Sequence, residues 1–211
     1  MSITIDRRTF LAGTATAALT AAWGGPALAQ QGPRDKITVR IDRDLANLDP
    51  AYRTGPWDAN VCRVVYQRLM KQKVNSAELE LDAAEKIDQL SPTEIGFTLK
   101  PGLMFTDGYG EMTAEDVKFS FERMGLPPKE GQKESPYKAD WGGLKAVEVT
   151  GKYTGKIVLE KPRANIFTTV IGDVSGCIVS KAAVEKLGAD YATKPVGTGP
   201  YRLTAIERQR G

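Results

Sequence analysis

The chain has 211 residues, of which 41% are hydrophobic and 26% charged, with a formal net charge of +3 and no histidine. This composition is ordinary for a globular protein, and so small a charge excess gives no reason to expect a nucleic-acid partner. Without histidine the chain cannot build a Ser-His-Asp or Cys-His catalytic relay or an imidazole metal ligand. We therefore expect neither enzyme activity nor a cofactor or metal site.

The first 29 residues have the features of an export signal. The motif Asp6-Arg7-Arg8-Thr9-Phe10-Leu11 resembles the twin-arginine motif, and an apolar Ala/Thr stretch continues to Ala22. That stretch is shorter than the roughly 20 residues that a membrane-spanning helix needs. Ala27-Leu28-Ala29 fits a small-x-small cleavage site, which places cleavage between Ala29 and Gln30. We expect a soluble periplasmic product, without a lipid anchor, that is delivered by the twin-arginine export machinery.

The rest of the chain mixes the two-residue period of strands with the 3.6-residue period of helices, without regular βαβ alternation. This mixture indicates an α+β or mixed α/β fold. We expect strands at 37–41, 86–90, 95–99, 145–150, 156–160 and 177–179, and helices at 57–69, 114–124, 164–170 and 181–187.

The helix after Thr113 has the clearest sequence signals. Thr113 is a typical N-cap residue, and the acidic residues that follow it suit the positive end of the helix dipole. Val117, Phe121 and Met124 recur at helical spacing and predict one buried face. The polar residues 126–143, rich in glycine, proline and lysine, predict a long surface loop after this helix.

Three ordered motifs carry a family resemblance. The segment from Phe97 to Gly108 reads Phe-Thr-Leu-Lys-Pro-Gly-Leu-Met-Phe-Thr-Asp-Gly, and residues 113–123 continue it. It closely resembles the signature of the extracellular solute-binding proteins of family 5, the dipeptide-, oligopeptide- and nickel-binding class. Asn-Leu-Asp-Pro-Ala at 47–51 and Val-Gly-Thr-Gly-Pro-Tyr at 196–201 match that family in the expected order.

The resemblance implies a two-lobed architecture of the periplasmic-binding-protein type II class. It assigns 30–65 to the first segment of the large ligand-binding lobe, 66–195 to a small α+β domain, and 196–211 to the return into the large lobe, after the signal at 1–29. Its implied function is delivery of peptides or similar small solutes to an ABC permease at the inner membrane. Relatives continue far beyond this point, so we expect an N-terminal fragment that does not bind peptides by itself.

The resemblance also places candidate ligand residues after the Leu-Asp-Pro bend, where relatives line one side of the cleft. These are Arg53, Thr54, Gly55, Pro56 and Trp57. The Arg53 guanidinium could bind a ligand carboxylate through two parallel hydrogen bonds, and the Gly-Pro backbone could present carbonyl groups. The alternative interpretation is structural, with Trp57 opening the apolar face of a helix and Arg53 simply solvated.

Other chemical motifs have structural explanations. Acid–base catalysis by two carboxylates requires them roughly 5–9 Å apart around a substrate. Turn and capping roles account for the four acids that invite this hypothesis, which are Asp107, Glu111, Glu115 and Asp116.

Gly197-Thr198-Gly199 suggests a phosphate loop, but Pro200 lacks the backbone N–H that such a loop needs. We expect a bend there instead.

Two questions stay open at the level of sequence. Cys62 and Cys177 are candidates for a disulfide in an oxidising compartment, or else are two separate buried thiols. A free-standing exported binding or scaffold module without a transport role is the main alternative to a solute receptor. An exported enzyme is a weaker alternative, because the chain lacks histidine and any nucleophile motif.

Overall fold

The computed structural model describes residues 5–7, 41 and 43–207. The predicted cleavage site at Ala29 and Gln30 lies outside these residues, as does most of the predicted strand 37–41, of which only Ile41 is described and lies in no strand. Within the described part of the chain, no helix has both the length and the apolar character required to cross a bilayer.

A four-stranded antiparallel sheet forms one end of the molecule, with the order β4-β5-β7-β6. Two hairpins supply it, since β4 pairs with β5 and β6 with β7, and β5 joins the hairpins by pairing with β7. Alternate residues of β7 are buried, as the two-residue period predicts, whereas β5 also buries Gly96 between Ile95 and Phe97. The strands predicted at 86–90, 95–99, 145–150 and 156–160 are confirmed, with bounds Ala84–Ser91 (β4), Glu94–Leu99 (β5), Leu144–Val149 (β6) and Thr154–Leu159 (β7).

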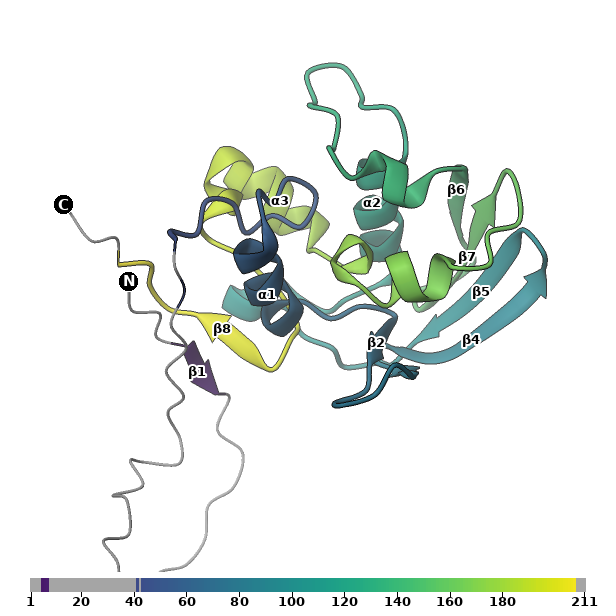
Figure 1. Cartoon of the computed structure of the whole chain (residues 1–211), viewed down its shortest axis with the longest axis horizontal. Helices are drawn as coiled ribbons and strands as arrows, with labels where there is room; N and C mark the ends of the chain where they lie inside the picture. Colours follow the sequence, from purple (N-terminus) through teal and green to yellow (C-terminus); the bar gives the residue numbers. More distant parts are fainter. Residues whose placement is uncertain (1–4, 8–40, 42, 208–211) are drawn as a thin grey trace, which may run out of the picture.

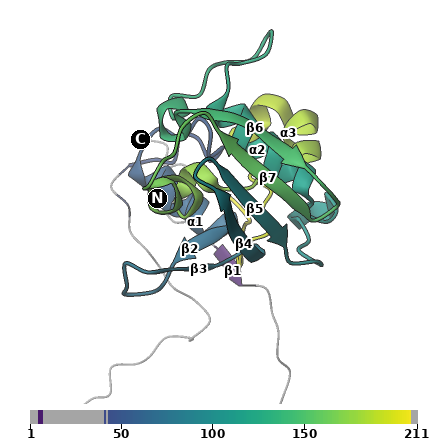
Figure 2. The same cartoon turned by 90° about the vertical axis from the view of Figure 1, so that its right-hand side faces the viewer.

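Helix α2 (Ala114–Gly125) covers one face of this sheet; Figure 2 looks onto the sheet with α2 behind it. Thr113 and Asp116 form a capping box, in which the Asp116 carboxylate accepts the Thr113 N–H at 3.0 Å. The predicted apolar face is confirmed, because Val117, Phe121 and Met124 are buried. The ring centroid of Phe121 lies 4.4 Å from that of Trp141, which ends the 3₁₀ turn η2 (Lys138–Trp141).

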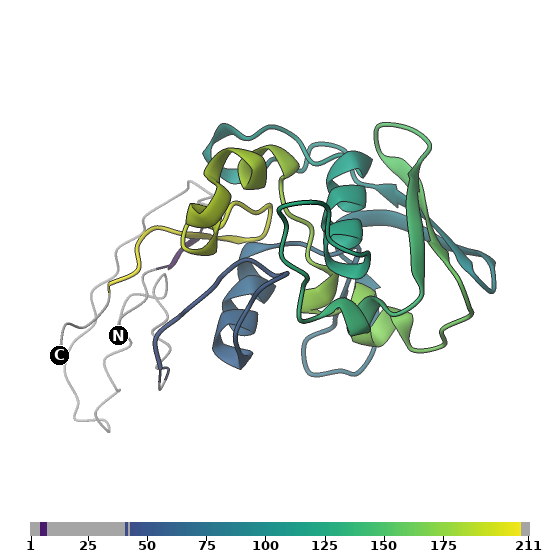
Figure 3. The ribbon, with the colours of Figure 1, turned by 90° about the horizontal axis from the view of Figure 1, so that it is seen from above.

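The opposite end of the molecule is mainly helical (Figures 1 and 3). Its regular helices are α1 (Pro56–Val65) and α3 (Lys181–Leu187), where the Ser180 hydroxyl caps α3 by accepting the Ala183 N–H. The chain also forms short helical turns, namely the 3₁₀ turns η1 (Thr106–Gly108), η4 (Val174–Gly176) and η5 (Gly188–Ala192) and the π-helical turn η3 (Phe167–Ile171).

Two predicted elements differ from the structure. The helix predicted to reach Leu69 ends at Val65, because the Val65 carbonyl accepts the Gly199 N–H at 2.8 Å and so is unavailable to continue the helix. The predicted strand 177–179 was wrong. Those residues are buried as expected, but they pack between α2 and the chain after α1 and form only one isolated bridge, from Cys177 to Arg68.

Two short antiparallel pairs complete the described strands. β2 (Met70–Gln72) pairs with β3 (Leu79–Leu81), and β1 (Ile5–Arg7) pairs with β8 (Tyr201–Leu203). β1 lies inside the predicted export signal, so its pairing belongs to the unprocessed chain.

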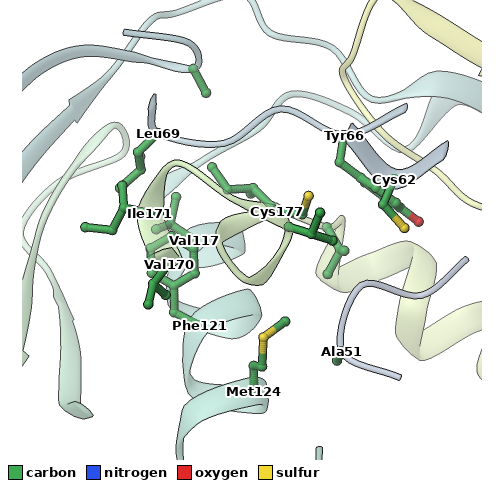
Figure 4. Close-up of a cluster of buried hydrophobic side chains, with 14 of the residues drawn as sticks. Ala51, Cys62, Tyr66, Leu69, Val117, Phe121, Met124, Val170, Ile171 and Cys177 are labelled. Atoms are coloured by element: carbon green, nitrogen blue, oxygen red, sulfur yellow. The ribbon is translucent and has the colours of Figure 1, made fainter. Parts of the chain in front are cut away.

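One hydrophobic core joins the two ends of the molecule. Figure 4 shows side chains of α1, α2, η3 and the segment around Cys177 converging on it. The predicted boundary between a large lobe and a small domain therefore does not interrupt the core, and that division stays a prediction.

Candidate functional site

The segment Asp49–Trp57, which contains the predicted ligand residues, lies directly before and at the start of α1. Asp58, in the first turn of α1, is 2% exposed. Its carboxylate accepts the N–H groups of Ala46, Asn47 and Thr54 and the Thr54 hydroxyl, at 2.8–3.2 Å. Asp58 thus folds the Leu-Asp-Pro bend back onto the N-terminus of α1.

Asp49 of the Leu-Asp-Pro bend ties this segment to α2. Its carboxylate accepts the Ala51 N–H at 3.1 Å and pairs with the Arg123 guanidinium, and both side chains are about nine-tenths buried. Burial lowers the pKa of Arg123, but the adjacent Asp49 charge and hydrogen bond outweigh it, so the pKa is raised overall. Arg123 therefore stays charged, and loss of the Asp49 carboxylate would leave this buried charge without its partner.

Arg53 is 8% exposed, and its guanidinium is already engaged within the protein. Nη1 donates to the Pro50 carbonyl at 2.7 Å and Nη2 to the Ser175 hydroxyl at 3.0 Å. The guanidinium carbon lies 3.4 Å from the centroid of the Tyr137 ring, and Nη2 is 3.7 Å from the Asp140 carboxylate. These contacts do not support the solvated alternative, and the predicted ligand contact of Arg53 stays a prediction.

The remaining predicted ligand residues form one contiguous and accessible stretch. Thr54 and Pro56 are exposed, while Gly55 and Trp57 are half-buried. Sequence reasoning did not identify the residues that hold this stretch from the other side, Tyr137, Asp140 and Ser175. Tyr137 and Asp140 lie in what was predicted to be a plain surface loop, where the only available signal was aromatic residues in an otherwise polar stretch.

The return bend at Gly197-Thr198-Gly199 packs against the C-terminus of α1. A Cβ atom at Gly197 would lie 2.1 Å from the Val65 carbonyl oxygen, and one at Gly199 would lie 2.5 Å from it. Only glycine permits this approach. The arrangement supports the predicted bend and accounts for both glycines without a phosphate ligand.

A separate groove of about 610 Å³ lies beside this bend, between η1, η5 and the residues that follow β8. Tyr109, Leu187, Val196, Leu203 and Ile206 supply its apolar lining, with Lys194 among the polar residues. None of its lining residues belongs to the segment Asp49–Trp57.

The two cysteines are free, buried thiols in the structure, so the candidate disulfide is not formed there. Burial raises the pKa of Cys177 to about 12 and raises that of Cys62 well above its ordinary value. Both groups are therefore protonated at neutral pH, and Cys62 Sγ donates to the Leu48 carbonyl at 3.5 Å.

Two of the four acids considered for catalysis have clear structural partners. Asp116 caps α2, and Glu111 accepts bonds from the Gly102 N–H, the Lys152 ammonium and the Tyr153 hydroxyl. The hydrogen bond from Lys152 is the largest of the effects that lower the pKa of Glu111 to about 2. Across the part of the chain that the structure describes, no three cysteine or carboxylate side chains are grouped as a metal site requires.

The family profile of the bacterial extracellular solute-binding proteins, family 5, matches residues 78–211. The chain belongs to this family. Its members are solute-binding proteins, and the family resemblance drawn from the three sequence motifs is confirmed.

Similar proteins support the same assignment. The glutathione-binding protein GsiB of Salmonella typhimurium is 29% identical over 182 residues, which are 84% of this chain and 33% of GsiB. Two solved structures are each 27% identical and cover 78% of the chain. They are MoaA of A. tumefaciens R10 with mannopinic acid (TM-score 0.71, 33% of MoaA) and DppA of Helicobacter pylori with the peptide STSA (TM-score 0.66, 36% of DppA).

These matches confirm the mixed α/β fold of the periplasmic-binding-protein class. The chain spans about a third of the length of the curated relatives that it matches.

Proposed function

We propose that this chain forms part of the periplasmic substrate-binding component of an ABC importer for peptides or related small solutes. The observation that carries the proposal is the accessible stretch Thr54–Trp57, held in a fixed place by buried polar contacts in a chain of this family. The names of the relatives suggest the kind of solute, since glutathione and the peptide STSA are both small peptides.

In this proposal the protein binds a solute and makes or breaks no bond. The stretch Thr54–Trp57 forms one side of a cleft and presents the Trp57 indole and a backbone without bulky side chains at Gly55. A small ligand buries most of its surface between two sides of such a cleft. Differential affinity for the closed state drives closure, and the closed protein is the form that an ABC permease would accept.

A chimaera with GsiB tests this proposal, because the chain matches about a third of the length of that relative. Residues 43–203 would replace the matching third of Salmonella GsiB, and glutathione binding would be measured by calorimetry. We expect saturable binding, which Trp57→Ala weakens at least about tenfold, the loss expected of a truncated anchor residue. Val74→Ala, on a side chain that is 90% exposed in the β2–β3 turn, is the matched control.

A chimaera that folds, as judged by circular dichroism, but binds no glutathione would contradict the proposal. It would favour the alternative of a binding or scaffold module without a transport role.

We further propose export to the periplasm by the twin-arginine route, on the basis of Arg7-Arg8 and the Ala-Leu-Ala motif. Changing both arginines to lysine should leave the precursor in the cytoplasm, and N-terminal sequencing of the exported wild-type chain should begin at Gln30. An unchanged periplasmic yield of the double variant would exclude this route.

A further inference from the structure

The Arg53 side chain connects three parts of the chain that are distant in sequence. Its guanidinium bonds the Pro50 carbonyl in its own segment, stacks on Tyr137 before η2, and donates to Ser175 in η4. The Ser175 hydroxyl in turn donates to the Asp140 carboxylate at 2.5 Å, and its carbonyl accepts the Trp141 indole N–H at 2.8 Å. Arg53 is therefore the centre of a buried polar network.

This network fixes the backbone next to Arg53 as well as its side chain. The Ser135 hydroxyl donates to the Ala51 carbonyl at 2.7 Å, and the Tyr137 hydroxyl donates to the Arg53 carbonyl at 2.9 Å. The next residue, Thr54, is bound to Asp58 through both its N–H and its hydroxyl. The accessible stretch Thr54–Trp57 therefore begins directly after Arg53, whose guanidinium and backbone carbonyl are both hydrogen-bonded.

The same network makes Arg53 a poor site for a ligand carboxylate. A carboxylate that approached the bonded N–H of Nη2 would have to displace the Ser175 hydroxyl, and at either N–H of Nη2 it would lie close to the Asp140 carboxylate, which is 3.7 Å from Nη2. Like charges this close repel each other, and a buried guanidinium that loses its acceptors is destabilised.

We propose that Arg53 is a positioning residue, which holds Thr54–Trp57 in the conformation that meets the solute and does not itself contact the solute. That a solute meets Thr54–Trp57 rests on the proposed function. The positioning of this stretch by Arg53 does not, because it concerns the protein in the absence of ligand.

Amide hydrogen exchange of the full chain, without ligand, tests the positioning. The reporters are the amides of Thr54 and Ala59, which bond to Asp58 and to the Gly55 carbonyl, and the amide of Ile157 in β7 serves as an internal reference. Arg53→Met should accelerate exchange at Thr54 and Ala59 by about ten- to hundredfold and leave Ile157 nearly unchanged.

Three further variants give the comparison. Arg53→Lys keeps the charge but not the fork of donors, so it should give an intermediate increase, and Ser175→Ala, which removes a single acceptor, should give a smaller one. Arg63→Met is the matched control, because Arg63 is on α1, is 41% exposed and pairs with Asp173 at the surface. It should change none of the reporters.

Two results would overturn the proposal. In the first, Arg53→Met leaves exchange at Thr54 and Ala59 at the wild-type rate but weakens glutathione binding by the corresponding GsiB chimaera. That combination would make Arg53 a ligand contact. In the second, Arg53→Met accelerates amide exchange at Ile157 as much as at Thr54 and Ala59. Arg53 would then contribute only to the stability of the whole fold. If Arg53→Met does not fold, Ser175→Ala decides between local and uniform acceleration. Failure of the chimaera to bind glutathione, with local acceleration intact, would contradict only the proposed function.

Discussion

The sheet with its covering helix α2 and the segment Asp49–Trp57 are stabilised in different ways. The sheet is assembled from two hairpins, whose strands are neighbours in sequence, and it buries alternate apolar side chains against α2. Asp49–Trp57 has regular structure only where α1 begins, and it is held by polar partners far away in the chain. Arg53 and Ser175 are 122 positions apart, and Asp49 and Arg123 are 74 apart.

This difference teaches how an accessible loop can be kept rigid without secondary structure. Apolar burial has no direction and tolerates small adjustments, so it specifies a core but not the conformation of an exposed loop. Hydrogen bonds and buried ion pairs are directional, and a group that loses its partner pays the full cost of desolvation. The two regions should therefore respond differently to substitution.

The largest effect should come from Phe121→Ala in the core beneath the sheet. Phe121 is fully buried beside Trp141, so the free energy of unfolding should fall by about 3–5 kcal/mol. Urea denaturation measures this change. Leu90→Ala, on a side chain that is 55% exposed, should cost less than about 1 kcal/mol. A loss below about 1 kcal/mol for Phe121→Ala would show that α2 does not bury this face.

Asp49→Asn should be the next most damaging substitution, and it tests the polar ties. It leaves the buried Arg123 guanidinium without its counter-charge, which should cost about 3 kcal/mol in urea denaturation. The double variant Asp49→Asn with Arg123→Met should lose less than the sum of the single variants, because the pair acts as one unit. Additive losses would mean that the two charges are not coupled.

Thr113→Ala should have a moderate effect, because it removes the N-cap of α2 but no core contact. We expect a loss of about 1 kcal/mol in the free energy of unfolding. Thr168→Ala, on an exposed threonine within the turn η3, is the control and should have almost no effect. Equal losses for the two variants would exclude a special role for the cap.

The smallest effect should be the pH dependence that Glu111 contributes. Its pKa is lowered from 4.5 to about 2 in the folded chain, first through its bond to Lys152. A lowered carboxyl pKa stabilises the fold above the unfolded pKa, and the contribution is lost as the pH falls through the folded value. The urea concentration at the unfolding midpoint should therefore decrease as the pH is lowered from about 5 to 2. This decrease should be smaller in Glu111→Gln. Glu115→Gln, on an exposed acid, should keep the wild-type slope.

Sequence periodicity was sufficient where the contacts are local. The hairpin strands, the Thr113 start of α2 and the helix predicted at 181–187 all follow from residues within a few positions of one another. The three ordered motifs were sufficient for the family, because their glycines, prolines and aromatics specify turns and packing. Periodicity failed for 177–179, since a short apolar run predicts burial but not whether the neighbouring chain is a strand or a helix.

The sequence by itself determined the hairpin strands, the capped helices and the family of this protein. Only the tertiary structure decided where α1 ends, why Gly197 and Gly199 are glycines, and what Arg53 binds. In each of those cases the deciding partner lies far away in the chain. The Gly199 N–H donates to the Val65 carbonyl and ends α1, and the same carbonyl lies too close to Gly197 and Gly199 for a side chain. The Arg53 guanidinium donates to the Ser175 hydroxyl. Long-range partners leave no periodic pattern in a single sequence, because they depend on how the whole chain packs.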